Sequence, residues 1–328
     1  MELREFTADD AAAISLAVEL ENAGNAVDCP WQHQVTPYRK EMEMRHGWDG
    51  EVGRHLLLYD GQTPVGGAEL STSEWDNREL VWLGLGIHPD HRRRGLGSGL
   101  VDRLLALSRE MGRSLAGADG WESPGVEAFA QSTGFARKSQ AIKRRMHLAE
   151  ADLAEVRRLR DLAAAEAAPY ELVRIAGRTP DELVEAVAEL TAAINDAPTD
   201  DLEYEDEVYP PERIREYESA QIEGGHRFYR LVARHRETGD LGGHTIVVVD
   251  SEQQAHSEQH DTSVVRSHRG HRLGLLLKAE MVLWLAEEEP QMTSVDTWNA
   301  ESNAHMIAVN VLLGYRVMGR EIQFQRRF

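Results

Sequence analysis

The sequence predicts an α/β fold made of two similar halves, because three features recur at nearly constant spacing. A basic loop with glycines joins a strand-like run to a helix-like run twice, at 91–97 and 268–274. A glycine pair inside a strand pattern recurs, and so does a Gly-aromatic pair after a helix pattern. The offsets are 177, 176 and 180 residues, between His91 and His268, Gly66 and Gly242, and Gly134 and Gly314. Such self-similarity indicates an internal duplication.

Composition and charge exclude several classes of protein. At 328 residues with 41% hydrophobic content, the chain is long enough for two domains with packed cores. A net charge of −20 argues against general nucleic-acid binding and is compatible with a cationic partner. Cys29 is the only cysteine, so neither an intramolecular disulfide nor a cysteine-based zinc site is expected. The histidine spacings indicate no metal site.

Neither a signal peptide nor a membrane span is expected. The stretch 1–6 has no apolar signal-peptide core, and no run approaches the roughly 20 apolar residues that a membrane helix needs. The expected location is therefore the cytoplasm, and no membrane partner is expected.

Local signals define the elements of the first half. A strand at 3–6 precedes Thr7, which caps a helix at 11–20 with acidic residues in its first turn. A hairpin is expected around Asp60-Gly61. The expected strands are 3–6, 54–59, 64–70, 80–87, 115–118 and 142–148, and the expected helices are 11–20, 38–45, the run from the loop to Gly112, and 125–133.

The second half begins after a connecting helix. The stretch 149–168 lacks Gly and Pro and is rich in helix formers, and Pro169 ends it. We therefore expect an N-terminal domain at 1–148, a connecting helix at 149–168 and a C-terminal domain at 169–328. Thr179 and Pro180 mark the start of a helix at 180–195. The other expected elements are strands at 171–176, 227–234, 242–247, 257–265 and 294–298, and a helix from 275 onward.

The two basic loops have the character of phosphate-binding sites. Glycine allows close approach of a ligand to the backbone, and the first amides of the following helix point at an anion, which the helix dipole also attracts. Plain helix capping is the alternative interpretation. The candidate ligand-binding residues are Arg92, Arg93, Arg94, Gly95, Leu96 and Gly97 in the first loop and Arg269, Gly270, His271, Arg272, Leu273 and Gly274 in the second.

These loops resemble the acetyl-CoA pyrophosphate loop of the GNAT superfamily, whose pattern is Gln/Arg-x-x-Gly-x-Gly/Ala. The first loop fits this pattern fully, whereas the second has Arg272 where the middle glycine is expected. The chain is thus similar to tandem GNAT proteins such as the mycothiol synthases. The resemblance implies two domains, each a mixed, mostly antiparallel sheet flanked by helices, with acetyl-CoA entering where the fourth and fifth strands separate.

Further cofactor contacts follow from the same resemblance. Backbone contacts to coenzyme A are expected at Leu85, Ile87, Val264 and Val265. A family motif places two more candidate contacts at Asn299 and Asn303. The tyrosine that many members use to protonate the leaving thiolate corresponds here to Asn310, or to Ala130 in the first half, so the general acid is unassigned.

Family spacing also points to a base. Related enzymes keep a Glu eleven residues, or a His nine residues, before the loop's first basic residue. These positions are Glu258 and His260, which alternate along a strand and so share a face, with Asp261 on the other face. The first half has Val81 and Leu83 there, so the chemistry is expected in the second half. A solvated strand end is the alternative interpretation of this polar stretch.

The predicted function is therefore transfer of an acetyl group from acetyl-CoA to a primary amine of a small molecule. The acidic run 200–207 could hold an ammonium group or be a solvated loop. Two other functions stay open: a non-catalytic acyl-CoA-binding or regulatory protein, and a transferase of longer acyl groups. The sequence gives no expectation for the oligomeric state.

Overall fold

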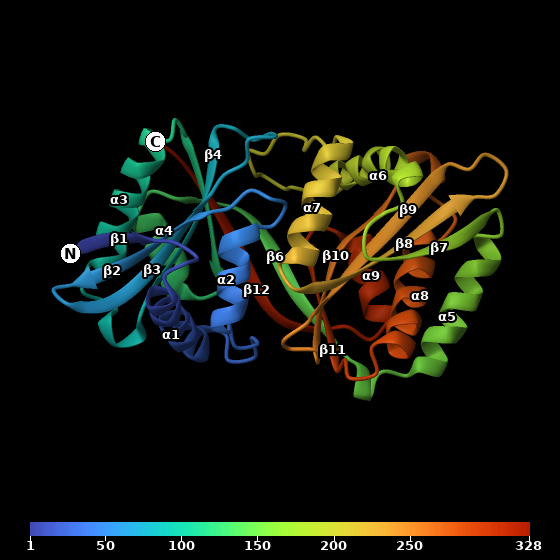
Figure 1. The fold of residues 1–328 in the computed structure, drawn as a ribbon, viewed down its shortest axis with the longest axis horizontal. Coiled ribbons are helices and arrows are strands. Elements are labelled where there is room, and N and C mark those ends of the chain that lie inside the picture. Colours follow the sequence, from blue (N-terminus) through green and yellow to red (C-terminus); the bar gives the residue numbers. More distant parts are fainter. The chain divides into compact units, whose positions relative to one another are not determined.

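A computed structural model describes all 328 residues, and the chain forms two compact units (Figure 1). The first unit comprises Met1–Ala141, Thr199–Asp206 and Gly319–Phe328, and the second comprises Ile142–Pro198 and Glu207–Met318. Each is an open, mixed sheet with helices on both faces, as the sequence predicts. None of the helices combines the length and the apolar character that a membrane-spanning helix requires.

The strands of the first unit follow the order β1-β2-β3-β4-β5-β12. Neighbouring strands pair antiparallel, except that β4 and β5 are parallel. Its elements are β1 (Glu2–Phe6), α1 (Ala11–Asp28), α2 (Pro37–His46), β2 (Arg54–Asp60), β3 (Thr63–Ser71), β4 (Leu80–Ile87), the 3-10 turn η1 (Pro89–His91), α3 (Leu96–Glu110), β5 (Leu115–Trp121), α4 (Pro124–Ser132), the start of β6 (Ala136–His147) and most of β12 (Arg316–Arg327).

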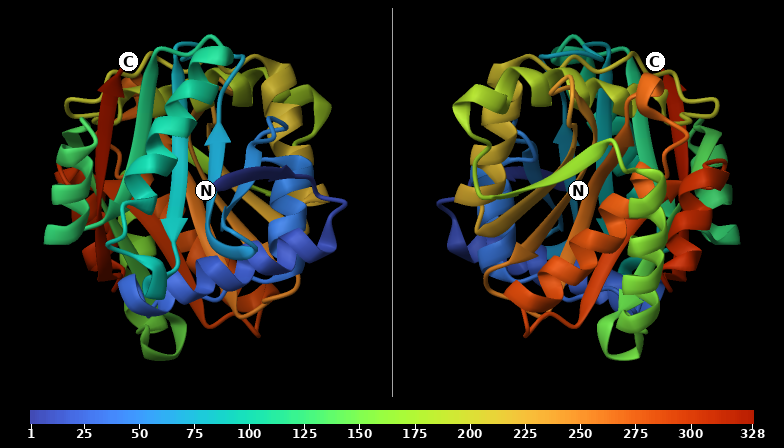
Figure 2. Two further views of the ribbon diagram at one scale, coloured as in Figure 1. Left: turned by 90° about the vertical axis from the view of Figure 1, so that its left-hand side faces the viewer. Right: turned by 90° about the vertical axis from the view of Figure 1, so that its right-hand side faces the viewer.

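Two layers of helices cover the first sheet (Figure 2, left). The apolar side of α3, with Leu100 and Leu104, packs against Val81 and Leu83 of β4 and forms the main core. On the opposite face, α1 and α2 pack around Phe6 in a smaller core. Residues that alternate along β2, β3 and β4 therefore face either α3 or the pair α1 and α2.

The second unit repeats this plan with the strand order β6-β11-β10-β9-β8-β7. Its β10 and β11 are parallel, and the pairs from β7 to β10 are antiparallel. Its elements are the end of β6, η2 (Leu148–Glu150), α5 (Leu153–Glu166), β7 (Tyr170–Ala176), η3 (Asp181–Leu183), α6 (Val184–Thr191), η4 (Ala192–Asp196), α7 (Pro211–Glu223), β8 (His226–His235), β9 (Leu241–Asp250), β10 (His256–Val264), η5 (Arg266–His268), α8 (Leu273–Glu288), β11 (Ser294–Ala300) and α9 (Ala304–Leu312).

Helices α5 and α8 cover one face of the second sheet, and α6 and α7 cover the other (Figure 2, right). Helix α8 is buried nearly all round, since apolar residues occupy almost every side of it. The largest core of the chain lies between α8, α5 and the sheet.

The structure differs from the sequence expectations in several places. Asp10 and not Thr7 caps α1, by accepting from Ala13 N. The helix expected at 180–195 is divided into η3, α6 and η4, without a cap from Thr179. The units do not divide at the helix expected at 149–168, because the first unit ends at Ala141 and takes back Gly319–Phe328. That helix begins only at Leu153, since Asp152 caps it by accepting from the amides of Ala154 and Glu155. Helix α7 has no counterpart among the expected elements. The domain boundaries at 148 and 169 stay a prediction about the duplicated halves.

Candidate functional site

In each unit the two parallel strands pair at one end and then separate. Strands β4 and β5 pair from Leu80 to Leu83 of β4, and β10 and β11 pair from His256 to Gln259 of β10. Beyond Leu83 and Gln259 the edge of each fourth strand has no parallel neighbour, so its peptide groups can accept an added strand or an extended ligand. Both units therefore present the gap that the sequence leads us to expect.

The fourth strand of the first unit leads to the loop at 92–97. Gly95 caps α3 with φ 78°, and Arg93 also has a positive φ, 63°. The guanidinium of Arg92 donates to Ile87 O at 3.0 Å and to Asp28 at 2.8 and 2.6 Å. These hydrogen bonds hold the loop in place through Arg92. The first amides of α3 receive no side-chain cap and point out of the helix.

The loop of the second unit has the same construction. Arg269 donates to Val264 O at 3.1 Å and to Asp196 at 2.6 Å, which matches Arg92 in the first loop. Gly270 and Arg272 have φ 89° and 54°. Arg272 therefore holds, as the cap of α8, the left-handed conformation that the family pattern leaves to glycine.

Space is open beside Gly274 at the start of α8. Gly274 is buried, yet a Cβ atom added to it would meet nothing within 4 Å. The side chain of Arg272 is directed to Glu166, with Nε 3.0 Å from the carboxylate. This arrangement fits an anionic group at the start of α8, where amides and dipole act together.

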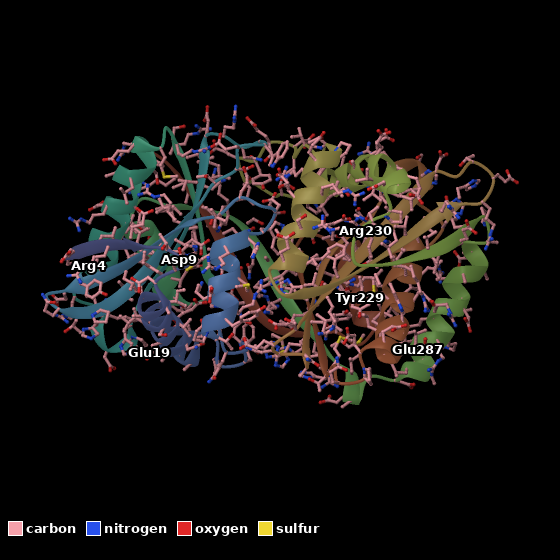
Figure 3. All side chains as sticks on the ribbon, in the orientation of Figure 1. Arg4, Asp9, Glu19, Tyr229, Arg230 and Glu287 are labelled. Carbon is pink, nitrogen blue, oxygen red and sulfur yellow. The ribbon has the colours of Figure 1, made fainter.

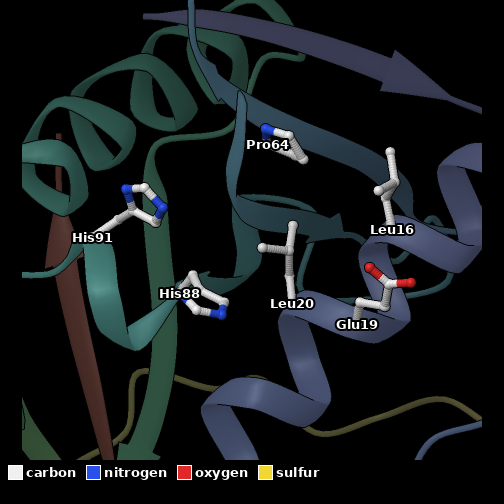
Figure 4. Close-up of a pocket in the computed structure, with 6 residues that line it drawn as sticks. All are labelled: Leu16, Glu19, Leu20, Pro64, His88 and His91. Atoms are coloured by element: carbon white, nitrogen blue, oxygen red, sulfur yellow. The ribbon is translucent and has the colours of Figure 1, made fainter. Parts of the chain in front are cut away.

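A pocket of about 210 Å³ lies beside the first loop (Figure 4). Helix α1 contributes Leu16, Glu19 and Leu20, and η1 and the residue before it contribute His91 and His88. The two imidazoles lie 5.7 Å apart, edge to face. The pocket is thus lined by both apolar and polar side chains, and it adjoins the candidate phosphate loop.

Glu258 and His260 lie on the face of the second sheet that α7 covers. Glu258 is opposite Val248, which packs in the same cluster as Tyr217 of α7. Trp298 Nε1 donates to Glu258 at 3.3 Å, and the hydroxyl of Tyr217 is 2.5 Å from His260 Nδ1. Both side chains are half-buried, so they are not a freely solvated strand end.

The expectation that Asp261 points to the other face is wrong. The register of β10 against β9 shifts between Gln259 and Thr262, so one extra residue is inserted on β10. Such a bulge breaks the alternation of faces. Asp261 consequently interacts with Glu207 and with Arg230 of β8, on the same side as His260.

Asp261 has the perturbed pKa of a candidate base. Burial and the carboxylate of Glu207 raise the pKa of Asp261 to about 6, although Arg230 lowers it. Burial followed by Glu207 raises the pKa of Tyr209, and burial raises that of Tyr217; the carboxylate of Asp261 adds to both rises. Sequence spacing missed this group, because a count along a regular strand cannot contain the bulge.

Arg230 anchors this polar face. Tyr229 and Arg230 point to opposite faces of β8 (Figure 3): the former contacts Trp284 of α8, and the latter donates to Glu218 of α7 at 2.5 Å. Glu218 is fully buried and also accepts from the Thr179 hydroxyl at 2.5 Å. A buried, paired charge of this kind fixes the position of α7 on the sheet.

His244 is the next polar group on this face. It is fully buried, and neither ring nitrogen has a hydrogen-bond partner. Its strand neighbour Ser263 is also buried with an unpartnered hydroxyl. Burial and the nearby Arg230 lower the pKa of His244 to about 3, so this imidazole is neutral at pH 7.

The other expected cofactor residues have mixed surroundings. Asn303 caps α9 by accepting from Met306 N at 3.1 Å, and Asn299 accepts from the amide of Asn310. The rings of His271 and Tyr170 are in contact at a tilted angle, with centroids 5.5 Å apart. The cofactor contacts of all these residues stay predictions. The same holds for the half-buried Leu85, Ile87, Gly97, Val264 and Val265, the exposed Arg94, and the buried Leu96 and Leu273.

The acidic run 200–207 is divided between the units. Asp200 accepts from Ser139 at 2.6 Å, and Glu203 accepts from Arg327 at 2.7 Å, all within the first unit. Only Glu207 belongs to the second unit, where it lies near Asp261. Most of the run is therefore used in local contacts.

Comparison with known proteins shows which family the first part of the chain matches. Residues 20–135 match the model of the Acetyltransferase (GNAT) family. Mycothiol acetyltransferase from Parafrankia sp. is 34% identical over 109 residues, which cover 33% of this chain and 32% of the relative. The enzyme of the same name from Stackebrandtia nassauensis is 30% identical over 147 residues, covering 44% and 46%. The chain thus matches less than half of the length of these relatives.

Solved structures match the whole chain. A tandem GNAT protein from the clavulanic acid biosynthesis pathway is 26% identical with a TM-score of 0.81, covering 99% of this chain and 98% of that one. A GCN5-related N-acetyltransferase from Sphaerobacter thermophilus, 14% identical with a TM-score of 0.70 and covering 99% and 95%, shares the fold. The chain thus contains a match to the GNAT acetyltransferase family at residues 20–135, and over its whole length it has the fold of a tandem GNAT protein.

Proposed function

We propose that the protein transfers an acetyl group from acetyl-CoA to a primary amine of a small molecule, with the chemistry in the second unit. The observation that carries this proposal is the combination, on β10, of a strand edge that separates from β11 with a bulge that holds titratable groups beside it. The names of the mycothiol acetyltransferases support an acetyl donor and a small acceptor for this chain.

Acetyl-CoA supplies the thioester, and the residues of β10 and α8 supply binding and proton transfer. The amides around Gly274 bind the pyrophosphate, and the open edge of β10 from His260 to Val264 binds the extended pantetheine. A β10 amide stabilises the oxyanion that forms when the amine nitrogen attacks the carbonyl carbon.

Asp261 is our first candidate for the base, because it lies in the bulge of β10 and its pKa is raised, and Glu258 and His260 are the other candidates. The acceptor reaches the site as an ammonium ion and must lose a proton before it attacks. An acid with a pKa of about 6 is mostly ionised at pH 7 and can take that proton. Since the base must be ionised, activity is expected to fall as the pH drops through about 6.

The test is kcat/KM against pH for three single variants, measured as release of the CoA thiol with a panel of primary amines. Asp261→Asn is expected to lower kcat/KM on the order of 10²-fold and to remove the acidic limb of the pH profile near pH 6. The Glu258→Gln and His260→Gln variants are expected to keep this acidic limb. Asp240→Asn, exposed in the turn before β9, is the matched control. A limb that follows Glu258 or His260 moves the role to that residue, and three unchanged profiles refute a base on β10.

The second candidate function is acyl-CoA binding without turnover. Two observations favour it. A buried Asn310 stands where many family members have the tyrosine that acts as general acid, and Arg272 replaces a loop glycine. Binding of acetyl-CoA with no CoA release for any amine would support this candidate. A transferase of longer acyl groups would show tighter competition by longer acyl-CoA esters. In either case Gly274→Glu is expected to weaken acyl-CoA binding to the second unit, because it places a carboxylate beside the phosphate site.

A further inference from the structure

One row of residues crosses the first sheet at the point where β4 leaves β5. Phe6 of β1 is opposite His55 of β2, His55 is opposite Glu69 of β3, and Glu69 is opposite Gly84 of β4. Gly84 directly follows Leu83, the last residue of β4 that pairs with β5. The row faces α1 and α2, since Phe6 packs with them.

Gly84 places no side chain between Glu69 and the gap, while the Glu69 carboxylate itself lies beside Ser71 and His55, with Oε1 2.8 Å from Ser71 Oγ and Oε2 3.8 Å from His55 Nδ1. A Cβ atom added to Gly84 would meet Glu69 Cβ at 3.5 Å and no other atom within 4 Å. Neighbouring strands lie about 4.8 Å apart, so a side chain on β3 is one strand spacing from the open edge of β4. The half-buried Glu69 is therefore one strand away from the gap of the first unit, and a turn of its side chain over Gly84 brings the carboxylate to the gap.

The corresponding row of the second unit has its titratable side chains on other strands. Arg230 is opposite Ile246 of β9, and Ile246 is level with the bulge that holds His260 and Asp261. The titratable groups are thus on the fourth strand there, whereas in the first unit the carboxylate is on the third strand and the fourth has glycine. Counting along β4 finds only Val81 and Leu83, both buried apolar residues.

Charges around Glu69 favour a cationic acceptor. Lys40 Nζ is 3.1 Å from Glu21 and 3.0 Å from Glu43, which leaves an excess of carboxylates when Glu69 is ionised. His55 is 5% exposed, its Nδ1 is 3.8 Å from Glu69, and its Nε2 has no hydrogen-bond partner. Because burial, followed by Lys40, lowers the pKa of His55 to about 4, this imidazole is neutral at pH 7 and can bond an ammonium or hydroxyl group.

We propose that the first unit is a second acetyl-transfer centre, in which Glu69 acts as the base for a cationic amine and reaches the acceptor across Gly84. The complete loop at 92–97 holds the acetyl-CoA. Glu69 removes one proton from the ammonium group and passes it to solvent. The amine nitrogen forms the new N–C bond, the thioester C–S bond breaks, and the second N–H proton converts the leaving thiolate to the thiol.

The protonation of Glu69 gives this centre its own pH profile. Burial and the carboxylate of Glu43 raise the pKa of Glu69, while Lys40 and the Ser71 hydroxyl, 2.8 Å away, lower it. Glu21 adds to the rise, and neutral His55 adds no charge. Glu43→Gln removes one raising charge, so the acidic limb of the first centre should move to lower pH.

The test uses the full chain with the second loop blocked by Gly274→Glu. Release of the CoA thiol is measured with acetyl-CoA and three probes: spermidine, tyramine and glucosamine. Residual release is expected with at least one probe, and adding Glu69→Gln should lower it on the order of 10²-fold. Adding Glu43→Gln instead should retain release with the limb displaced downward.

Gly84→Val tests the same point with Glu69 intact. Its added methyl groups stand between Glu69 and the gap and block the turn of the carboxylate over residue 84, so it should lower release as Glu69→Gln does, while thermal melting confirms folding. Equal rates with and without Glu69→Gln would overturn the proposal, and so would absence of release from the Gly274→Glu protein with all three probes. These outcomes are independent of the Asp261→Asn result, which concerns the second unit.

Discussion

At the scale of single residues, the two loops show how a duplicated site can keep its shape with different side chains. Each loop has two residues in the left-handed region, Arg93 and Gly95 in the first and Gly270 and Arg272 in the second. In each loop one of the pair is glycine and the other arginine, in opposite order. The bend that exposes the helix amides is therefore retained, although left-handed backbone costs a non-glycine residue about 1–2 kcal/mol.

Replacing Gly95 isolates this backbone cost. A Cβ atom on Gly95 or on Gly86 would meet nothing within 4 Å, but only Gly95 has a positive φ, 78°. Gly95→Ala should therefore lower the free energy of unfolding by about 1 kcal/mol relative to Gly86→Ala. Urea denaturation of the two variants measures the difference. Equal stabilities would mean that the loop relaxes to another conformation when it carries an alanine.

Lys278 should make stability depend on pH. It is 1% exposed, its ammonium group donates to Gln259, and burial lowers its pKa to about 7. The unfolded chain has a lysine pKa of about 10.4, so between these values the unfolded state binds more protons and stability rises with pH. The contribution is on the order of a few kcal/mol between pH 7 and 10.

Lys278→Met removes this titration. The variant should unfold at a higher temperature than the parent at pH 7, and the gap between them should narrow toward pH 10. Tyr315 still donates to Gln259 at 3.2 Å in the variant, so the amide keeps a partner. Parallel pH profiles of the melting temperature would show that Lys278 stays charged in the folded protein.

At the scale of elements, regular patterns were readable in the sequence and irregular ones were not. The strands, the basic loops and the helix near 38–45 follow periodicity and turn signals, whereas the cap expected at Thr7 is supplied by Asp10. The bulge in β10 has no such signal, and it changes the face of Asp261. The Glu69–Gly84 pair was equally hidden, because cross-strand neighbours depend on register and not on spacing along one strand.

Strand β12 gives an element-scale prediction. It pairs with β5, and Ile322 is fully buried in the core of the first unit, while Val317 of the same strand is 46% exposed. Ile322→Ala should cost about 2–5 kcal/mol, whereas Val317→Ala should cost little.

Hydrogen exchange in the β5 segment, Leu115–Trp121, locates that effect. Ile322→Ala should accelerate exchange there, although the substitution is about 200 residues away along the chain. Unchanged protection of β5 together with lowered stability would place the contribution of Ile322 outside the first unit.

At the scale of the whole molecule, the duplication was predictable because its landmarks are glycines and basic residues with fixed roles. The position of the last strand was not. A sequence repeat suggests that each half completes its own sheet, yet Gly319–Phe328 belongs to the first unit and Ile142–His147 to the second. A fragment ending at 148 would therefore lack β12, the strand that pairs with the outer edge of β5. Ligand binding by the first unit is best measured in the full chain.

The position of β12 also has a consequence for synthesis. The ribosome releases the N-terminal end first, so β1 to β5 are complete long before Gly319–Phe328 emerges. Until then β5 is an unpaired edge, and the apolar surface that Ile322 and Phe324 later cover is exposed to other nascent chains. Gly319–Phe328 is translated after the whole second unit and completes the first unit, so a chain terminated before Gly319 would keep an aggregation-prone edge on β5.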